Sequence, residues 1–208
     1  MAPMIPAIVL AAGRSSRMGA PKATMPIDDD TFLVRIVRTF LDAGVDDVVI
    51  VLGHDRDPIA ASFAASGLPA RLVINADYAR GQLSSLQAGL AVVDRPGVNA
   101  VLMTLVDVPL VRATTVRAVL DRFHRTHAPI VRPVDGERHG HPLLFARALF
   151  DALRTADPGA GAKPIVRAHA SPAGDVVVDD PGAFVDVDTM EEYRRVISAG
   201  GADRSPKS

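Results

Sequence analysis

The chain has 208 residues, 48% of them hydrophobic, a formal net charge of -1 and no cysteine. This length supports a sizeable core, while the missing cysteine excludes disulfides, zinc–thiolate sites, iron–sulfur clusters and thiol catalysis. The balanced charge gives no general surface for nucleic acid, and no apolar run approaches the roughly 20 residues that a membrane-spanning helix needs. We therefore expect a cytoplasmic protein with neither a nucleic-acid partner nor a membrane partner.

Apolar runs typical of strands alternate with helical patterns through the first two thirds of the chain. This alternation predicts an α/β fold with a mostly parallel sheet. The predicted strands are continuous in Val, Ile or Leu, as expected when helices cover both faces; they span residues 5–11, 47–52, 70–74 and 100–105. The spacing of apolar residues predicts helices over residues 32–43, 84–93, 114–124 and 190–198. We assign the apolar start of the chain to the first strand, not to a signal peptide, because it lacks a basic segment.

The composition changes after residue 128. Prolines and glycines separate short apolar runs over residues 128–180, which we interpret as a smaller lobe on the acceptor side of the site. The last residues, 199–208, have little to bury and are predicted to form a flexible tail. We therefore expect one domain over residues 1–198.

The loop after the first strand, residues 13–22, combines glycines with cations. Gly13 and Gly19 allow close approach of a ligand, and Arg14, Arg17 and Lys22 supply positive charge for phosphate groups. The spacing fits neither G-x-x-x-x-G-K-[ST] nor G-x-G-x-x-G. An ordinary surface turn is the alternative, but the chain has only three lysines, so a lysine at the end of this loop favours a phosphate site.

Other polar residues follow the predicted strands and should meet this loop at one edge of the sheet, where α/β proteins bind ligands. His54 and Asp55 follow the second strand, Asn75 and Asp77 the third, and Asp107 the fourth. Magnesium takes one or two protein carboxylates together with phosphate oxygens, so Asp107 is a candidate ligand. A turn or a helix cap is the alternative role for this aspartate.

Residues 75–90 place amide and hydroxyl groups around Gly81, just before a predicted helix. Asn75, Ser84 and Ser85 therefore suit recognition of a base and a ribose, with helix capping as the alternative for Ser84. The pair His139 and His141 does not indicate zinc, because no third nitrogen ligand is evident. His124 and His127 are interpreted as surface residues at a helix end.

Residues 10–22 read Leu-Ala-Ala-Gly-x-Ser-x-Arg-Met-Gly-x-x-Lys without a gap. This run resembles the motif of the molybdenum cofactor cytidylyltransferases and molybdopterin-guanine dinucleotide synthases. The resemblance implies a Rossmann-like, GT-A-type, three-layer α/β/α fold, with Arg14, Lys22 and Asp107 as catalytic residues. It also implies that the nucleotide contacts Leu10, Ala11, Ala12, Gly13, Arg14, Ser15, Arg17, Met18, Gly19, Lys22, Asn75, Gly81, Ser84 and Ser85.

Three further segments carry the resemblance. Residues 105–109 are similar to the family's Gly-Asp-x-Pro, with Val106 in place of the glycine, which implies that Asp107 binds the metal. Residues 186–192 resemble Asp-Ile-Asp-Thr-Pro-Glu-Asp and imply a second carboxylate, for which we favour Asp188 over Asp186, although Asp188 is also a candidate helix cap. Residues 139–145 resemble Gly-His-Pro-x-x-Phe, so His141 is expected at the acceptor.

The resemblance therefore implies a nucleotidyltransferase that uses Mg²⁺, or alternatively Mn²⁺, and releases pyrophosphate. Ala11 and Ala12 before Gly13 resemble the cytidylyl branch, which favours CTP as the nucleoside triphosphate. The expected acceptor is a phosphorylated compound of the molybdopterin cofactor type, with a sugar phosphate or another small alcohol phosphate as the alternative. A hypothesis of another class is a non-catalytic nucleotide-binding or delivery protein that docks to a molybdoenzyme.

Overall fold

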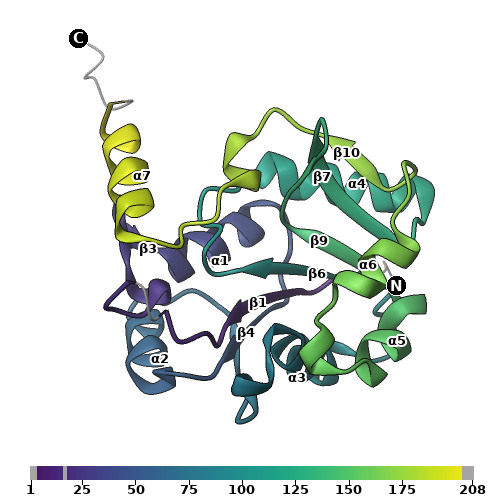
Figure 1. Ribbon diagram of the computed structural model, residues 1–208, viewed down its shortest axis with the longest axis horizontal. Coiled ribbons are helices and arrows are strands. Elements are labelled where there is room, and N and C mark those ends of the chain that lie inside the picture. The colour runs from purple at the N-terminus through teal and green to yellow at the C-terminus, as the bar shows by residue number, and fades with distance from the viewer. Residues whose placement is uncertain (1–3, 16–17, 203–208) are drawn as a thin grey trace.

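The computed structural model describes residues 4–15 and 18–202. Its centre is an eight-stranded sheet in the order β10-β7-β9-β6-β1-β4-β5, with β8 paired to β7, and helices pack on both faces (Figure 1). The predicted three-layer α/β fold is confirmed. The strands are β1 (Ala7–Ala11), β4 (Val48–Leu52), β5 (Arg71–Ile74), β6 (Ala100–Leu105), β7 (Ile130–Asp135), β8 (Arg138–His139), β9 (Leu143–Ala146) and β10 (Asp175–Val177), with a separate hairpin of β2 (Pro26–Ile27) and β3 (Asp30–Thr31).

The four strands predicted from apolar runs are β1, β4, β5 and β6, and their ends differ from the prediction by two residues or fewer at each end. They pair in parallel, with Val9 of β1 opposite Ile50 of β4 and Thr104 of β6. Strand β9 runs antiparallel to both β6 and β7. The sheet is therefore mostly parallel, and the carboxyl ends of β1, β4, β5 and β6 share one edge.

Side chains of β1 alternate between two cores. Val9 and its neighbours on one face pack against α1, α2 and α4, whereas Ile8 and Leu10 on the other face pack against α3 and α5. This alternation follows from the two-residue period of a strand, and it explains why the strand is apolar at every position. The helices are α1 (Phe32–Asp42), α2 (Arg56–Ala64), α3 (Gln82–Val93), α4 (Ala113–Thr126), α5 (Phe150–Thr155), α6 (Lys163–His169) and α7 (Met190–Ala202), with short 3-10 turns η1 (Lys22–Thr24), η2 (Tyr78–Arg80), η3 (Arg147–Leu149), η4 (Pro158–Ala160) and η5 (Pro181–Phe184).

Strand β5 departs from the expectation that helices cover both faces of each predicted strand. It is the edge strand of the sheet, and Leu72 and Ile74 are 43% and 56% exposed. An apolar run reports strand propensity, but the position of that strand in the sheet depends on tertiary pairing. The prediction that helices cover both faces of this strand is therefore wrong for β5.

Helix α2 was not predicted, because its apolar positions are few; Ile59 and Phe63 are the buried ones. Helix α7 continues to Ala202, so the first residues of the predicted tail are helical, and the rest of that tail lies outside the described residues. Within the described part of the chain, no helix is both long and apolar enough to cross a membrane.

Residues 128–180 do not simply sit beside the sheet. They contribute β7, β9 and β10 to it, and α5 and α6 to one of its faces. The residues that follow, 181–188, lead to the edge of the sheet that carries the loop after β1. There the backbone N of Val187 donates a hydrogen bond to the carbonyl of Asp107. The division into a domain and an acceptor-side lobe stays a prediction.

Candidate active site

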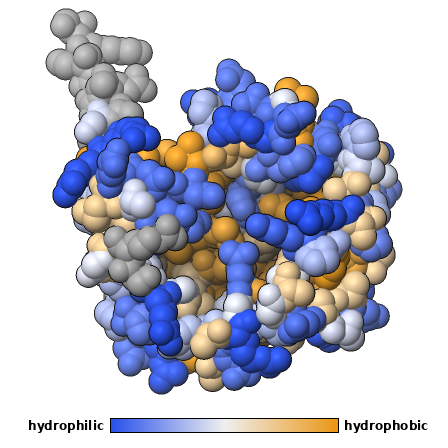
Figure 2. Space-filling model, viewed as in Figure 1, coloured by the Kyte–Doolittle hydropathy of each residue, from blue (hydrophilic) through white to orange (hydrophobic). Residues whose placement is uncertain are grey.

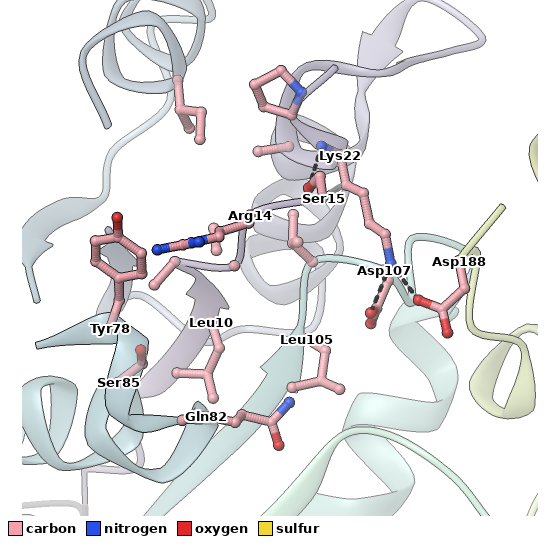
Figure 3. A pocket seen from close by; sticks show the side chains of 18 residues that line it. Leu10, Arg14, Ser15, Lys22, Tyr78, Gln82, Ser85, Leu105, Asp107 and Asp188 are labelled. Atoms are coloured by element: carbon pink, nitrogen blue, oxygen red, sulfur yellow. Dashed lines mark hydrogen bonds and ion pairs between the residues drawn. The ribbon is translucent and has the colours of Figure 1, made fainter. Parts of the chain in front are cut away.

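A cavity of about 290 Å³ opens at the carboxyl ends of β1 and β6. Figure 2 shows a hollow on this face, with an apolar floor and a hydrophilic rim. The loop after β1, the start of α3 and one residue of the segment before α7 complete the walls (Figure 3). The lining residues are Leu10, Ala11, Ala12, Gly13, Arg14, Ser15, Pro21, Lys22, Ala23, Ile59, Tyr78, Gly81, Gln82, Ser85, Leu105, Val106, Asp107 and Asp188.

The loop after β1 is shaped by its own hydrogen bonds. Ser15 adopts a left-handed conformation at φ 48°, its carbonyl accepts from Met18 N at 2.9 Å, and its Oγ accepts from Lys22 N at 3.0 Å. Gly13 needs no special conformation, and a Cβ added to it would meet nothing within 4 Å. Since the protein itself does not require a glycine there, the absent side chain leaves room for a ligand in the cavity.

Lys22 is the last residue of this loop, and the ammonium group of its side chain contacts two carboxylates. The residue is 8% exposed. Its Nζ lies 3.2 Å from Oδ2 of Asp107 and 2.5 Å from Oδ1 of Asp188 (Figure 3). Loop, strand end and C-terminal segment therefore converge on one ammonium group.

Asp107 and Asp188 are brought together by main-chain contacts. Asp107 follows β6, and its carbonyl accepts a hydrogen bond from Val187 N at 2.8 Å. Beyond Asp188, Thr189 and Glu192 form a reciprocal cap on α7: Glu192 Oε2 accepts from the backbone N of Asp188 and of Thr189, both at 2.8 Å, and Thr189 Oγ1 accepts from Glu192 N at 3.2 Å. Thr189 is thus the side chain that caps the helix, which leaves the Asp188 carboxylate turned to Lys22.

Asp186 takes a different position from Asp188. It does not line the cavity, but its carboxyl group is close enough to Asp107, Asp188 and Lys22 for their charges to affect its pKa. Burial raises its pKa, and the negative charges of Asp107 and Asp188 raise it further, while Lys22 opposes the shift. Among the described residues, no group of three or more histidine or acidic side chains is arranged to hold a metal ion.

The remaining loop residues take several roles. Arg14 is exposed, and its guanidinium carbon lies 6.0 Å from the centre of the Tyr78 ring. Met18 is buried in a small core with Met25, Phe32 and Val187, so it supports the loop from beneath. Gly19 is exposed at φ 71°, and the predicted contact of Arg17 falls outside the described residues.

Asn75 is placed beside the cavity, but its amide is engaged within the protein. Its Nδ2 donates to Oγ of Ser84 at 2.9 Å and of Ser85 at 3.0 Å, and its Oδ1 accepts from Asp77 N at 2.9 Å. Ser84 in turn donates to the carbonyl of Gly81 at 2.7 Å. Asn75 therefore holds the turn before α3 in shape. Helix α3 begins at Gln82 with Gly81 as its N-cap, so the capping alternative for Ser84 is wrong.

Two cavity residues, Tyr78 and Gln82, were not singled out from the sequence. Tyr78 packs against Gly53, where an added Cβ would come within 2.7 Å of the tyrosine, and its hydroxyl lies 3.3 Å from Nδ1 of His54. Gln82 is exposed to the cavity at the first turn of α3. Both occur in the segment around Gly81, and only the folded turn shows which of its side chains face inward.

His141 precedes β9 and lies outside the cavity lining. Burial lowers its pKa, and the nearby Asp107 carboxylate partly opposes that shift, so the ring is held neutral at physiological pH. Its backbone N donates to Ala183 O at 2.8 Å, and its Nδ1 is buried without a hydrogen-bond partner in the described part of the chain. His124 and His127 are exposed at the end of α4, as expected.

A mostly parallel sheet, a glycine-containing loop after its first strand and a lysine beside two aspartates agree with the nucleotidyltransferase class that the sequence motif implies. The MobA-like NTP transferase domain matches residues 7–173, and the chain belongs to this family. The resemblance found in the sequence is thereby confirmed at the level of the family.

Relatives cover nearly the whole chain. Nicotine blue oxidoreductase of Paenarthrobacter nicotinovorans is 32% identical over 94% of this chain and 97% of its own. A probable molybdenum cofactor guanylyltransferase of Mycobacterium avium is 28% identical over 92% and 94%. The crystal structure of Rv0371c from Mycobacterium tuberculosis superimposes with a TM-score of 0.81 at 30% identity, covering 95% of this chain and 99% of that one. The same protein has also been crystallised in complex with manganese; that structure gives a TM-score of 0.76 at 28% identity over 94% and 99%.

Proposed function

We propose that this nucleotidyltransferase moves CMP from CTP to a phosphorylated acceptor of the molybdopterin cofactor type. The observation that carries the proposal is the convergence of Lys22, Asp107 and Asp188 on one cavity beside the loop after β1. The choice of CTP is supported by Ala11 and Ala12, which line that cavity and resemble the cytidylyl branch of the family.

In the proposed reaction, an acceptor phosphate oxygen attacks the α-phosphorus of the triphosphate. A new O–P bond forms, the bond between the α-phosphorus and its bridging oxygen breaks, and pyrophosphate leaves with the bonding electrons. Such reactions depend mainly on alignment and on neutralising phosphate charge. Arg14 and the loop amides would hold the β- and γ-phosphates, and Lys22 would face the α-phosphate or the acceptor.

The two aspartates fit a divalent cation, for which we propose Mg²⁺ with Mn²⁺ as an alternative. Oδ1 of Asp107 is buried and has no hydrogen-bond partner among the residues that the structure describes, so a ligating oxygen is available. The manganese complex of Rv0371c supports a divalent metal in this family. Asp107 and Asp188 would hold the ion, with Asp186 nearby, and a bound cation would stabilise the charge on the phosphate oxygens.

The base and ribose would lie at the end of the cavity formed by the Gly81 turn and the start of α3. Gly81, Gln82 and Ser85 there are uncharged, whereas Lys22 and the aspartates mark the phosphate end; Arg14 reaches toward Tyr78, with its guanidinium carbon 6.0 Å from the centre of that ring. Because Asn75 supports the turn through its own hydrogen bonds, we assign base contact to Gln82 and to Ser85. His141 is proposed on the acceptor side.

Pyrophosphate release tests the proposal. The protein is incubated with each of CTP, GTP, ATP and UTP, with Mg²⁺ or Mn²⁺, and with molybdopterin cofactor or small alcohol phosphates as acceptors. CTP with the molybdopterin cofactor should give the highest kcat/KM. Tight nucleotide binding without turnover for any acceptor would instead support a non-catalytic delivery protein. Since one relative is named Nicotine blue oxidoreductase, turnover of nicotine blue is followed as a separate arm.

A further inference from the structure

We propose that Lys22 is a built-in counterion of the Asp107–Asp188 pair, which a divalent cation must displace before the lysine can serve the substrate phosphates. Metal binding and release of the ammonium group would then be one coupled event. The inference rests on the proposed function, because it concerns which cation, Lys22 or the metal ion, pairs with the carboxylates of that same site.

The geometry shows that the ammonium group fills the position between the carboxylates. Nζ of Lys22 is within ion-pair distance of both Asp107 Oδ2, at 3.2 Å, and Asp188 Oδ1, at 2.5 Å. The side chain of Lys22 is 10% exposed, against 21% for Asp107 and 39% for Asp188. A charged group this deeply buried needs paired charges, and these two carboxylates provide them.

A metal ion held by Asp107 and Asp188 would share both carboxylates with the ammonium group, even if it binds Asp107 through Oδ1, which has no hydrogen-bond partner among the described residues. Mg²⁺ binds oxygen at about 2.0–2.1 Å, so the ion would lie within several ångströms of Nζ. Like charges at that separation repel. Occupancy of the carboxylates by Lys22 and by a divalent ion is therefore competitive.

Only the side chain of Lys22 has to move. Its backbone N is held by Ser15 Oγ at 3.0 Å, and its carbonyl accepts from Met25 N at 3.0 Å within the turn η1. The four-carbon stem is flexible, and the residue also lines the cavity together with Arg14. An ammonium group released from Asp107 and Asp188 thus remains at the phosphate end of the cavity.

This arrangement gives Lys22 two states with different partners. Without metal, it is paired with both carboxylates. With metal, it becomes available to anionic oxygens of the triphosphate or of the acceptor. The full set of positive charges would therefore be directed at the substrate only when the ion is present.

Binding of Mn²⁺ without nucleotide, followed by electron paramagnetic resonance, tests the competition. Lys22→Met keeps the length of the side chain and removes its charge. Lys163→Met is the matched control, because it also removes one lysine charge but lies exposed at the start of α6. We expect Lys22→Met to bind Mn²⁺ at least about tenfold more tightly than the wild type, with Lys163→Met unchanged. Equal or weaker Mn²⁺ binding by folded Lys22→Met would overturn the inference.

A measurement on the wild type keeps the test decisive if Lys22→Met fails to fold. The chain has three lysines, at positions 22, 163 and 207, so their side-chain ¹³Cε signals can be assigned by single substitution. Titration with Mg²⁺ alone should shift the Lys22 signal and leave that of Lys163 in place. A Lys22 signal that stays unchanged while Mg²⁺ binds would contradict the displacement.

The two ideas fail in different ways. Absence of metal-dependent pyrophosphate release from any nucleotide would remove the proposed function, whatever the Mn²⁺ affinities are. Turnover that depends on metal, together with equal Mn²⁺ affinity of the wild type and Lys22→Met, would retain the function and remove the role of Lys22 as an internal counterion.

Discussion

The backbone N–H of Val187 donates to the carbonyl oxygen of Asp107 at 2.8 Å. This bond joins the end of β6 to the segment that precedes α7, and it places Asp188 opposite the Asp107 carboxylate, with Lys22 between them. The composition of the site thus depends on a main-chain contact between distant parts of the sequence.

Removing the charge of Asp107 should abolish most of the activity without unfolding the protein. Asp107→Asn keeps the size of the side chain, but an amide neutralises Lys22 poorly and is a weaker metal ligand. We expect kcat to fall by a factor of about 10² or more, as for loss of an electrostatic contact in an active site. Pyrophosphate release measures the rate, and circular dichroism verifies the fold.

Asp77→Asn is the matched control for this substitution. Asp77 follows β5 at the same edge of the sheet, but its side chain is 71% exposed and lies 3.9 Å from Arg80. The kcat of Asp77→Asn should stay within about twofold of that of the wild type, because exposed ion pairs contribute little. A similar loss in both variants would mean that the rate reports general charge at this edge and not a role of Asp107.

Substitution of Gln82 should change the choice of nucleotide base. The glutamine amide can both donate and accept hydrogen bonds at the uncharged end of the cavity. Gln82→Ala should reduce the ratio of kcat/KM between CTP and GTP by about tenfold, the value of one hydrogen bond of ordinary strength. Gln82→Met separates loss of the polar group from loss of volume. An unchanged ratio in both variants would assign base choice to the backbone of the Gly81 turn or to Ser85.

Asp180 should stabilise both the fold and the position of Asp188. It is 3% exposed and accepts hydrogen bonds from Arg112 N at 2.9 Å, Thr115 Oγ1 at 2.6 Å and Gly182 N at 3.2 Å. Its carboxylate therefore meets the N-terminus of α4, where negative charge is favourable. Asp180→Ala should lower the free energy of unfolding by about 2–3 kcal/mol, as measured by urea denaturation.

The neighbouring Asp179 provides the comparison for Asp180. Its side chain is exposed, so Asp179→Ala should change the free energy of unfolding by less than about 0.5 kcal/mol. Because the segment from Asp180 leads to Asp188, Asp180→Ala should also weaken Mn²⁺ binding. Normal Mn²⁺ affinity in that variant would show that the Val187 contact alone positions Asp188.

The cap on α7 should make stability depend on pH through Glu192. Its pKa is lowered, first by the hydrogen bond from the backbone of Asp188 and then by the Thr189 side chain. The folded state therefore favours the ionised carboxylate. The resulting stabilisation is complete above the ordinary pKa of glutamate and is lost as the pH falls through the lowered value.

Glu192→Gln isolates this contribution, because glutamine resembles the protonated acid. The wild type should unfold at a higher temperature than Glu192→Gln at pH 7, and the difference should shrink as the pH falls below the ordinary glutamate range. Glu191→Gln is the control, since Glu191 is 83% exposed and pairs only with Arg195 at 3.1 Å in the structure as described. A difference independent of pH would show that the carboxylate charge of Glu192 does not stabilise the cap.

Much of the fold could be predicted because its signals are local. The continuous apolar runs of β1, β4 and β6 predict strands whose ends agree with the structure to within two residues. The spacing of apolar residues in α1 and α4 predicts helices with one buried face. The short strands β9 and β10 gave weak signals, since they contain few residues. Their antiparallel and parallel partners depend on contacts remote in sequence.

The motifs in the sequence indicate the nucleotidyltransferase family and most of the polar residues that line the cavity: both ends of the loop over residues 13–22, the turn at Gly81 and the acids at 107 and 188. How the polar atoms of these residues are used depends on contacts between distant parts of the chain. The Asn75 amide donates its hydrogen bonds to Ser84 and Ser85, whereas Gln82 lines the cavity. The Lys22 ammonium group lies between two aspartates. The physical reason is that residue types set which interactions are possible, whereas hydrogen bonds and ion pairs form only between atoms that the fold brings within a few ångströms.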